Sequence, residues 1–364
     1  MNYVVFGGTF DPIHSAHIRV AREAAKRFDA CVIFVPAKNP RWKEPTETSE
    51  NRLEMLKLAL KAVDFKYEIE EYELNSNAEV NYSIDTIKHL KEKYSNDNLY
   101  LLIGFDQVNQ FNEWRDAEEL SNLAQIVYVN RPGYTLNKDI VNKFKMVDLN
   151  YLESGDVSST DIRELRSLDI SDEVLHYIET NRLYFVKKLS TFILEKRLNH
   201  SISVANLALK IARVNKLENS EKYYIAGLLH DLGKTYNKED ENLLSLMKKH
   251  YPEFLDIPNF AYHQFVGEML AREEFGIKDA EILDAIKFHC TGKANMSELG
   301  MVIYASDKID PLRDFDSTWL MNSCFKNWKQ GFLDTLEDNK KYLLEHKKDI
   351  TNKLTDECFE MYLK

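Results

Sequence analysis

A glycine pair between an apolar run and a helical pattern most constrains the fold of this chain. The run from Tyr3 to Phe6 has strand character, and residues 14–28 carry apolar side chains at helical spacing. Glycines at such a turn let the backbone approach a phosphate, and the free N–H groups of the helix start attract its charge. His14 and His17 are expected to project from the same face of the first helical turn. This segment therefore predicts a phosphate site.

Strands and helices alternate in the first half of the chain, whereas helices alone follow in the second. Further strands are expected near residues 31–35, 67–74, 99–103 and 126–129, and helices near residues 51–63 and 83–94. This alternation predicts an α/β Rossmann-like parallel sheet with ligands at the carboxyl ends of its strands.

The helical pattern of the second half predicts a separate all-α domain. Amphipathic stretches without strand signals lie near residues 201–214, 223–232, 264–275 and 280–288. A chain of 364 residues usually forms more than one core, and the expected domains are residues 1–186 and 187–364. Residues 319–364 carry no motif and are expected to cap the helical core or to serve an interface.

Composition and charge exclude several function classes. The net charge of −11 argues against an unspecific grip on nucleic acid, although a local cationic pocket would still accept nucleotides. The sequence shows no apolar run that could span a bilayer and no cationic-then-apolar leader, so we expect a cytoplasmic protein without a membrane partner. The four cysteines form no C-x-x-C pair and indicate neither disulfides nor a zinc-thiolate site. The sequence does not decide between a monomer and a homo-oligomer.

The segment from Gly7 to His17 resembles the signature GGxFDPxHxGH of the HxGH nucleotidyltransferase superfamily, with Ala16 in place of the last glycine. Further segments are similar, in order and spacing, to one branch, nicotinate mononucleotide adenylyltransferase. They are residues 40–43 (PRWK), 51–56 (NRLEML), 81–86 (NYSIDT), 104–106 (GFD) with Trp114, 131–133 (RPG) and 157–163 (VSSTDIR).

This resemblance implies transfer of AMP from ATP to nicotinate mononucleotide, giving deamido-NAD and pyrophosphate. His14 and His17 would donate hydrogen bonds to phosphate oxygens, while Lys43 and Arg163 would add positive charge. Mg²⁺ would bridge the triphosphate. The implied nucleotide-binding residues are Gly7, Gly8, Thr9, Phe10, Ser83, Thr86, Gly104, Asp106, Trp114, Arg131, Ser158, Ser159 and Thr160.

The acceptor is left open by departures from the family pattern at Trp42, Ser83 and Phe105. Nicotinamide mononucleotide is one alternative. Pantetheine phosphate and glycerol phosphate are others, although the segment from Tyr82 to Thr86 and Trp114 disfavour them.

The adjacent pair His230-Asp231 lies in an apolar stretch, where both side chains are costly to bury unless something pairs with them. A metal ion would do so. Other candidate ligands occur at intervals along the second half of the chain: His200, His263, His289 and Asp307.

This order of ligands resembles the HD-domain superfamily of metal-dependent phosphohydrolases. The resemblance implies two metal ions bridged by Asp231, and mixed imidazole and carboxylate ligands suit iron or manganese. Residues 289–292 and 307–313 are similar to those of symmetrical diadenosine tetraphosphate hydrolases, which would release two ADP. Asp231 and Lys234 would be catalytic, and the polyphosphate would be held by Arg197, Lys308 and Arg313.

The substrate of the second domain is also left open. Guanosine tetraphosphate and deoxynucleotides are alternatives, as is a nucleotide sensor without catalysis. His250 lies off the ligand pattern and is expected at the surface.

Overall fold

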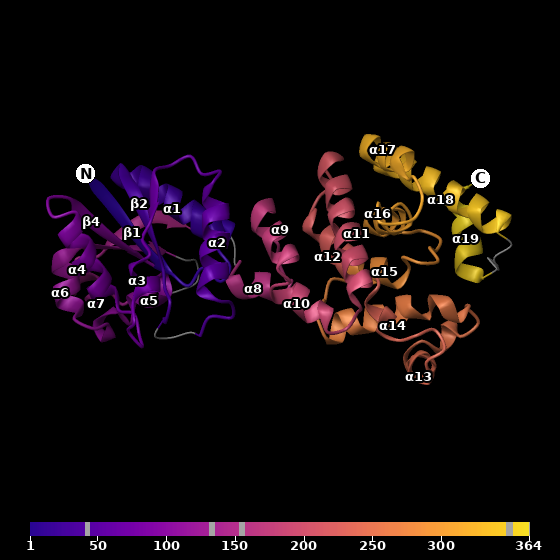
Figure 1. Cartoon of the computed structure of the whole chain (residues 1–364), viewed down its shortest axis with the longest axis horizontal. Coiled ribbons are helices and arrows are strands. Elements are labelled where there is room, and N and C mark those ends of the chain that lie inside the picture. Colours follow the sequence, from indigo (N-terminus) through magenta and orange to yellow (C-terminus); the bar gives the residue numbers. More distant parts are fainter. Residues whose placement is uncertain (41–43, 131–134, 153–156, 347–351, 364) are drawn as a thin grey trace. The chain divides into compact units, whose positions relative to one another are not determined.

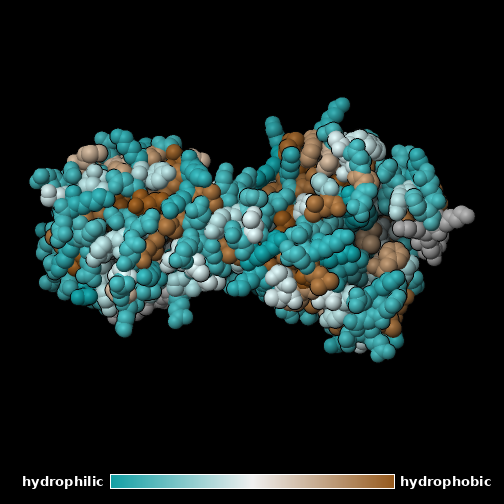
Figure 2. All heavy atoms as spheres, viewed as in Figure 1, coloured by the Kyte–Doolittle hydropathy of each residue, from teal (hydrophilic) through white to brown (hydrophobic). Residues whose placement is uncertain are grey.

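The computed structural model describes residues 1–40, 44–130, 135–152, 157–346 and 352–363, with only the backbone of Leu152. By its internal contacts the chain divides into two compact units, Met1–Tyr184 and Phe185–Lys364 (Figure 1). Hydrophilic residues cover most of the visible face of each unit (Figure 2). Among the described helices, none combines the length and the apolar character that crossing a membrane requires.

The first unit is built on one parallel sheet in the strand order β3-β2-β1-β4-β5-β6. This confirms the expected α/β fold. The chain leaves β1 toward β2 on one side and returns beside β1 as β4, and ligands usually bind at such a reversal. The strands are β1 (Asn2–Gly8), β2 (Ala30–Pro36), β3 (Tyr67–Ile69), β4 (Asn98–Ile103), β5 (Gln125–Asn130) and β6 (Val147–Leu152).

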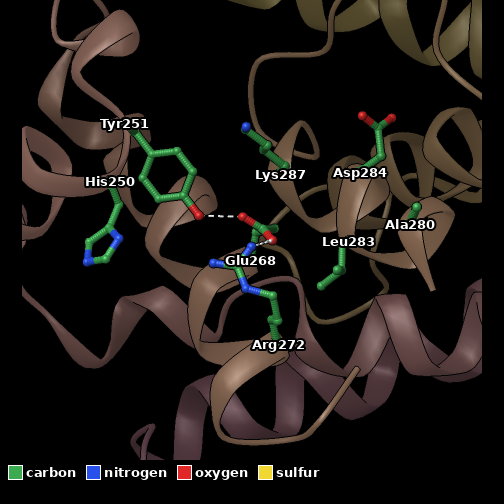
Figure 3. A pocket seen from close by; sticks show the side chains of 8 residues that line it. All are labelled: His250, Tyr251, Glu268, Arg272, Ala280, Leu283, Asp284 and Lys287. Atoms are coloured by element: carbon green, nitrogen blue, oxygen red, sulfur yellow. Dashed lines mark hydrogen bonds and ion pairs between the residues drawn. The ribbon is translucent and has the colours of Figure 1, made fainter. Parts of the chain in front are cut away.

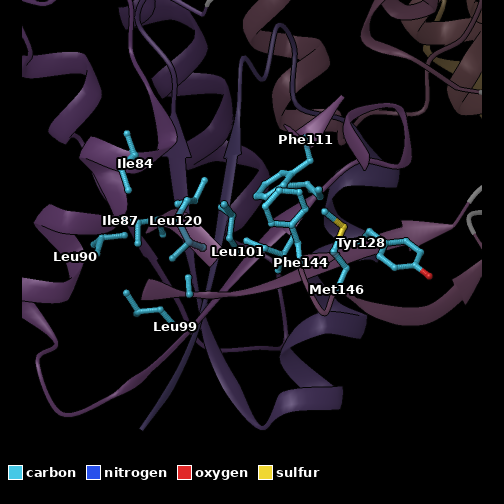
Figure 4. Close-up of a cluster of buried hydrophobic side chains, with 14 of the residues drawn as sticks. Ile84, Ile87, Leu90, Leu99, Leu101, Phe111, Leu120, Tyr128, Phe144 and Met146 are labelled. Carbon is cyan, nitrogen blue, oxygen red and sulfur yellow. The ribbon is translucent and has the colours of Figure 1, made fainter. Parts of the chain in front are cut away.

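Helices pack against the sheet because alternate strand residues point to opposite faces. Tyr3 and Val5 of β1 belong to a buried cluster with Ile87 of α4 and Leu120 of α6, part of which Figure 4 shows. The helices of this unit are α1 (Ser15–Phe28), α2 (Ser49–Leu60), α3 (Tyr72–Asn75), α4 (Ser83–Lys93), α5 (Phe105–Val108), η1 (Phe111–Glu113), α6 (Ala117–Leu123), α7 (Lys138–Lys143), α8 (Ser159–Arg163) and α9 (Asp172–Thr180).

Two strand expectations need correction. The strand expected at residues 67–74 ends at Ile69, and residues 72–75 form the short helix α3. The edge strand β6 (Val147–Leu152) was not predicted, although its sequence VDLNYL alternates apolar and polar residues. The sheet therefore has one more strand than expected.

The second unit contains helices and no strand among its described residues, which confirms the expected all-α domain. Its elements are α10 (Tyr184–Ser190, starting at the last residue of the first unit), α11 (Glu195–Val214), α12 (Glu221–Leu229), η2 (Leu232–Thr235), α13 (Glu241–His250), η3 (Pro252–Phe254), η4 (Asn259–Ala261), α14 (Tyr262–Glu273), α15 (Ala280–Lys287), α16 (Glu298–Lys308), α17 (Thr318–Lys326), α18 (Trp328–Glu345) and α19 (Lys353–Tyr362).

The last helices cover part of the helical core. Phe332 of α18 and Phe359 of α19 are buried in one cluster with Met301 and Tyr304 of α16. The motif-free end of the chain thus supplies apolar side chains that shield the helix carrying Asp307.

Candidate active sites

The turn after β1 is folded tightly around a buried aspartate. A Cβ at Gly8 would lie 2.9 Å from the Phe10 ring, so a larger residue there would have to displace that buried ring. Phe10 itself has a φ of 48°, in the left-handed region that is uncommon for large side chains. The Oδ2 atom of buried Asp11 accepts a hydrogen bond from the Thr46 N–H at 2.6 Å. The local chain is therefore fixed before His14 is reached.

His14 and His17 lie side by side at the start of α1. His14 is the N-cap residue rather than a member of the first turn, which corrects the expected placement. Its backbone N–H donates to Nδ1 of His17 at 3.3 Å, and the two ring centroids are 3.8 Å apart. Both rings line a cavity of about 260 Å³, whose wall also includes Ala16 and Asp106.

A second cavity of about 390 Å³ adjoins the first. Both are lined by residues 102–104 and Asp106, at and after the carboxyl end of β4. Predicted residues in the wall of the second cavity are Gly7, Gly8, Thr9, Ser83, Gly104, Asp106 and Trp114. Two neighbouring hollows in this position can accept two ligands whose reacting ends meet at the shared wall.

The second cavity also has polar lining residues that the sequence pattern did not reveal. Buried Glu73 lines this cavity and accepts a hydrogen bond from Thr86 Oγ1 at 2.6 Å. Thr86 is thus linked to the cavity wall through Glu73. Burial raises the pKa of Glu73 despite that bond. The Arg115 guanidinium lies 4.9 Å from the centroid of the Tyr82 ring. The buried indole N–H of Trp114 has no hydrogen-bond partner among the described residues.

The helix α8 is tied to the phosphate turn by its polar side chains. Ser158 caps the helix through Asp161, and Ser159 Oγ donates to the Pro12 carbonyl at 2.9 Å. Arg163 donates to the Asp11 carbonyl at 2.6 Å and to Thr160 Oγ1 at 2.9 Å. These predicted phosphate ligands are thus brought to the histidine turn.

Two further predicted residues of the transferase site, Lys43 and Arg131, lie outside the described residues.

In the second unit, the four predicted histidine ligands are all oriented by a bond at Nδ1. Backbone carbonyls three residues earlier lie 2.7 Å from Nδ1 of His230, 2.7 Å from that of His263 and 2.8 Å from that of His289. Nδ1 of His200 lies 2.6 Å from Oδ2 of Asp310. An acceptor at Nδ1 fixes the tautomer and leaves the Nε2 lone pair for a metal ion.

The Nε2 atoms converge with two buried carboxylates. Asp231 Oδ1 lies 3.4 Å from Nε2 of His263 and 3.6 Å from that of His289. Asp307 Oδ1 lies 3.2 Å from Nε2 of His200 and 3.6 Å from that of His230. Ligand atoms form two overlapping groups, one of His200, His230 and Asp307, the other of His230, Asp231 and His289.

The protonation states of most of these groups suit a cation at this centre, whereas the carboxylates of Asp307 and Asp310 raise the pKa of His200 to about 9 despite its burial. Burial lowers the pKa of His263, and it lowers that of His289 to about 3, so both rings are neutral near pH 7. Burial alone would raise the pKa of Asp231 and Asp307. The nearby histidines hold the pKa of Asp231 well below the usual range, and Lys308 with the nearby histidines does the same for Asp307. The Nε2 atoms of His200 and His230 are buried without a hydrogen bond to any described residue, despite their nearness to Asp307. The Nε2 atoms of His263 and His289 lie 3.2 Å apart.

This donor set fits divalent metal ions. Unbonded imidazole nitrogens and ionised carboxylates repel one another unless positive charge lies between them. Imidazole with carboxylate is typical of iron, manganese and similar ions.

Cationic side chains lie around the same centre. Arg197 contacts Asp231 Oδ2 at 3.1 Å, Lys308 contacts Asp307 Oδ2 at 2.8 Å, and Arg313 bonds to Oδ1 of Asp307. The predicted phosphate-binding residues are therefore next to the predicted ligands. Lys234 follows in η2, and its charge lowers the pKa of His263.

The chain around the His-Asp pair departs from a continuous helix. Helix α12 ends at Leu229, and η2 begins after Asp231. Gly233 permits this turn, because a Cβ there would lie 2.0 Å from the His263 carbonyl oxygen. Asp310 was not predicted as a site residue, although its spacing of three from Asp307 could have indicated a supporting carboxylate.

A third cavity, of about 340 Å³, lies in the second unit and includes none of the predicted ligands (Figure 3). Buried Glu268 accepts hydrogen bonds from Tyr251 and Arg272 at its base. Lys287 lies over the rings of Tyr251 and neighbouring phenylalanines. His250 lines this cavity and is exposed, as expected.

Both halves of the chain are similar to known proteins. A cytidylyltransferase-like family model matches residues 5–165, and an HD domain model matches residues 197–312. A Mycoplasma genitalium protein named probable nicotinate-nucleotide adenylyltransferase/Ap4A hydrolase is 33% identical over 92% of this chain and 96% of its own length. The protein of that name from Mycoplasma pneumoniae is 30% identical over 92% and 98%.

A solved HD superfamily hydrolase from Clostridium acetobutylicum, described as involved in NAD metabolism, is 28% identical. The match covers 49% of this chain and 94% of that structure, with a TM-score of 0.44.

Proposed function

The chain belongs to the family of two-domain proteins named for nicotinate-nucleotide adenylyltransferase and Ap4A hydrolase, and from this membership we propose a bifunctional enzyme of adenine nucleotides. The first unit transfers AMP from ATP to nicotinate mononucleotide. The second unit hydrolyses diadenosine tetraphosphate to two ADP. For the transferase, the supporting observation is the pair of adjoining cavities with His14 and His17 in one wall.

In the transfer step, a phosphate oxygen of the mononucleotide forms a bond to the α-phosphorus of ATP as the bond to the β-phosphate breaks. Pyrophosphate leaves with the electron pair, so positioning and charge stabilisation carry the catalysis. His14 and His17 donate to the phosphate oxygens, and the N–H groups and charge beside α8 receive the rest of the triphosphate. ATP enters with Mg²⁺, which is held by its phosphates and water.

The second cavity receives the pyridine end of the acceptor. The unpartnered Trp114 N–H and the Arg115 guanidinium both favour a carboxylate over a carboxamide. This supports nicotinate over nicotinamide mononucleotide. Burial raises the pKa of Glu73, and this shift toward the neutral form reduces its repulsion of that carboxylate.

For the hydrolase, the supporting observation is the convergence of four Nε2 atoms on two carboxylates. His200, His230, Asp231, His263, His289 and Asp307 would hold two ions, iron or manganese, and His230 belongs to both of the ligand groups that the structure brings together. When bound, the ions lower the pKa of water and neutralise phosphoanhydride oxygens. Arg197, Lys308 and Arg313 then bind the outer phosphates, and water adds to phosphorus as ADP leaves.

The full chain, loaded anaerobically with Fe²⁺ or Mn²⁺, tests both activities in parallel. One assay supplies ATP with nicotinate or nicotinamide mononucleotide, and the other supplies diadenosine tetraphosphate. His17→Ala should lower only the transfer rate, by about 10²-fold or more, because it removes a donor to the developing charge. Asp231→Ala should abolish only ADP release and reduce the bound metal.

His346→Ala is the matched control, since His346 is exposed in the turn after α18 and lies in neither site. Transfer without ADP release by the wild-type chain would reject the proposed hydrolase substrate. Equal rates with both mononucleotides would reject the nicotinate preference.

A further inference from the structure

Tyr184 connects the end of the first unit to the phosphate turn near its start. It is the last residue of that unit, and its buried phenol donates a hydrogen bond to Asp11 Oδ1 at 2.7 Å. Both side chains are almost fully inaccessible, with 7% and 1% of their surface exposed. A contact between residues so far apart in sequence fixes the turn from outside its own loop.

Asp11 is hydrogen-bonded to three separate segments of the chain. Its Oδ2 atom accepts from the Thr46 N–H, ahead of α2, and its carbonyl accepts from Arg163 of α8, each at 2.6 Å. Asp11 is also three residues before His14 in the turn. A rotation of the Asp11 carboxylate would therefore disturb the turn that presents both histidines.

The Tyr184 phenol acts only as a donor in this bond. Burial, with the nearby Asp11 carboxylate, raises its pKa far above the ordinary value, so the hydroxyl keeps its proton. Buried Arg52 supplies a nearby positive charge and donates to the Thr9 carbonyl at 2.6 Å. The charge on Asp11 is thus compensated, while its Oδ1 depends on Tyr184 for a hydrogen bond.

Tyr184 is held in an uncommon backbone conformation. Its φ is 50°, in the left-handed region, although it begins the helix α10. A tyrosine in this region needs compensating contacts, and the bond to Asp11 is one of them.

We propose that Tyr184 is a positioning residue for adenylyl transfer, which acts through Asp11 on the turn carrying His14 and His17. This inference rests on the proposed transferase function. Tyr184 contacts no nucleotide in this assignment. Its effect should fall on the rate of the chemical step rather than on the affinity for the acceptor.

Tyr184→Phe in the full chain removes the phenol oxygen and keeps the ring. The transferase kcat should fall about tenfold, because a small displacement of positioning groups is enough for such a loss. The KM for nicotinate mononucleotide should stay within about twofold. Hydrolysis by the second unit normalises the concentration of intact chain, and the thermal unfolding of the first unit measures whether that unit stays folded.

Tyr177→Phe is the matched control. The Tyr177 hydroxyl donates to Asn51 Oδ1 at 3.0 Å in the same unit, so it bonds to α2 rather than to Asp11. It should leave kcat unchanged. Equal losses in both variants would show a general packing effect and overturn the inference.

A double-mutant cycle with Asp11→Ala tests the route. Tyr184→Phe should cost nothing further in the Asp11→Ala background, whereas additive losses would reject action through Asp11.

Hydrogen exchange separates this inference from the proposed function. Amides of residues 9–14 should exchange faster in Tyr184→Phe than in Tyr177→Phe, whether or not the acceptor is nicotinate mononucleotide. An inactive wild-type chain would reject the proposed transferase alone. Unchanged exchange together with unchanged kcat would reject the role of Tyr184.

Discussion

Single residues set the geometry of both sites, and Gly233 shows how narrow the tolerance is. A Cβ there would lie 2.0 Å from the His263 carbonyl and 2.8 Å from the Gly267 nitrogen. Because both atoms are backbone, Gly233→Ala should force η2 from α14 and destabilise the second unit by about 1–3 kcal/mol. Bound Mn²⁺ per chain should fall with it. Thermal unfolding and elemental analysis measure the two effects.

Gly300→Ala provides the comparison within the same unit. Its added Cβ would meet neighbours at 3.4 Å or more in the helix α16, so the free energy of unfolding should change little or rise slightly. Similar losses in both variants would contradict the steric explanation.

Arg115 should contribute to the choice of acceptor at the residue scale. Arg115→Gln removes the cation from the second cavity but keeps a polar side chain. The ratio of kcat/KM for nicotinate over nicotinamide mononucleotide should fall about tenfold, since a charge-assisted bond is lost. Steady-state rates with both acceptors measure this ratio.

Lys88→Gln is the control for Arg115, because Lys88 is a cation paired with Glu119 and does not line the cavity. An unchanged ratio in Arg115→Gln would assign the preference to other groups, among them the Trp114 N–H.

At the scale of elements, the helix α18 should stabilise the second unit through its buried face. Phe332→Ala should lower the free energy of unfolding by about 3–5 kcal/mol, because a fully buried ring leaves a cavity. Leu344→Ala in the same helix should stay within about 0.5 kcal/mol, because Leu344 is mostly exposed. Denaturant unfolding of both variants checks this, and equal effects would show that α18 does not close the core.

Elements also show what the sequence could predict. Strong periodicity located β1, β2, β4 and β5 and the parallel architecture. It overextended β3, because the Tyr72 to Leu74 run is as compatible with a helix as with a strand. The predicted metal ligands, which the structure brings together, could be proposed from the sequence because their spacing is distinctive. Glu73 and Tyr184 depend on long-range packing that no local pattern records.

At the scale of the whole molecule, two separate cores predict separate responses to ligands. A ligand stabilises the unit that binds it, by about 2.7 kcal/mol at a hundred times its dissociation constant. Mn²⁺ should therefore slow hydrogen exchange in the described residues after 185 and leave residues 1–130 unchanged. A nonhydrolysable ATP analogue with Mg²⁺ and nicotinate mononucleotide should protect the first unit. Protection of both units by Mn²⁺ alone would contradict this independence.

The orientation of the predicted histidine ligands determines how the proposed metal centre could be lost in related proteins. The Nδ1 atoms of His230, His263 and His289 each lie next to a backbone carbonyl three residues earlier. A side-chain substitution does not remove a backbone carbonyl. His200 instead depends on the carboxylate of Asp310. A single substitution at Asp310 can therefore misalign His200 while all six predicted ligand residues remain unchanged. Related proteins that keep all six predicted ligands but lack hydrolase activity should therefore be examined first for a substitution at the position of Asp310.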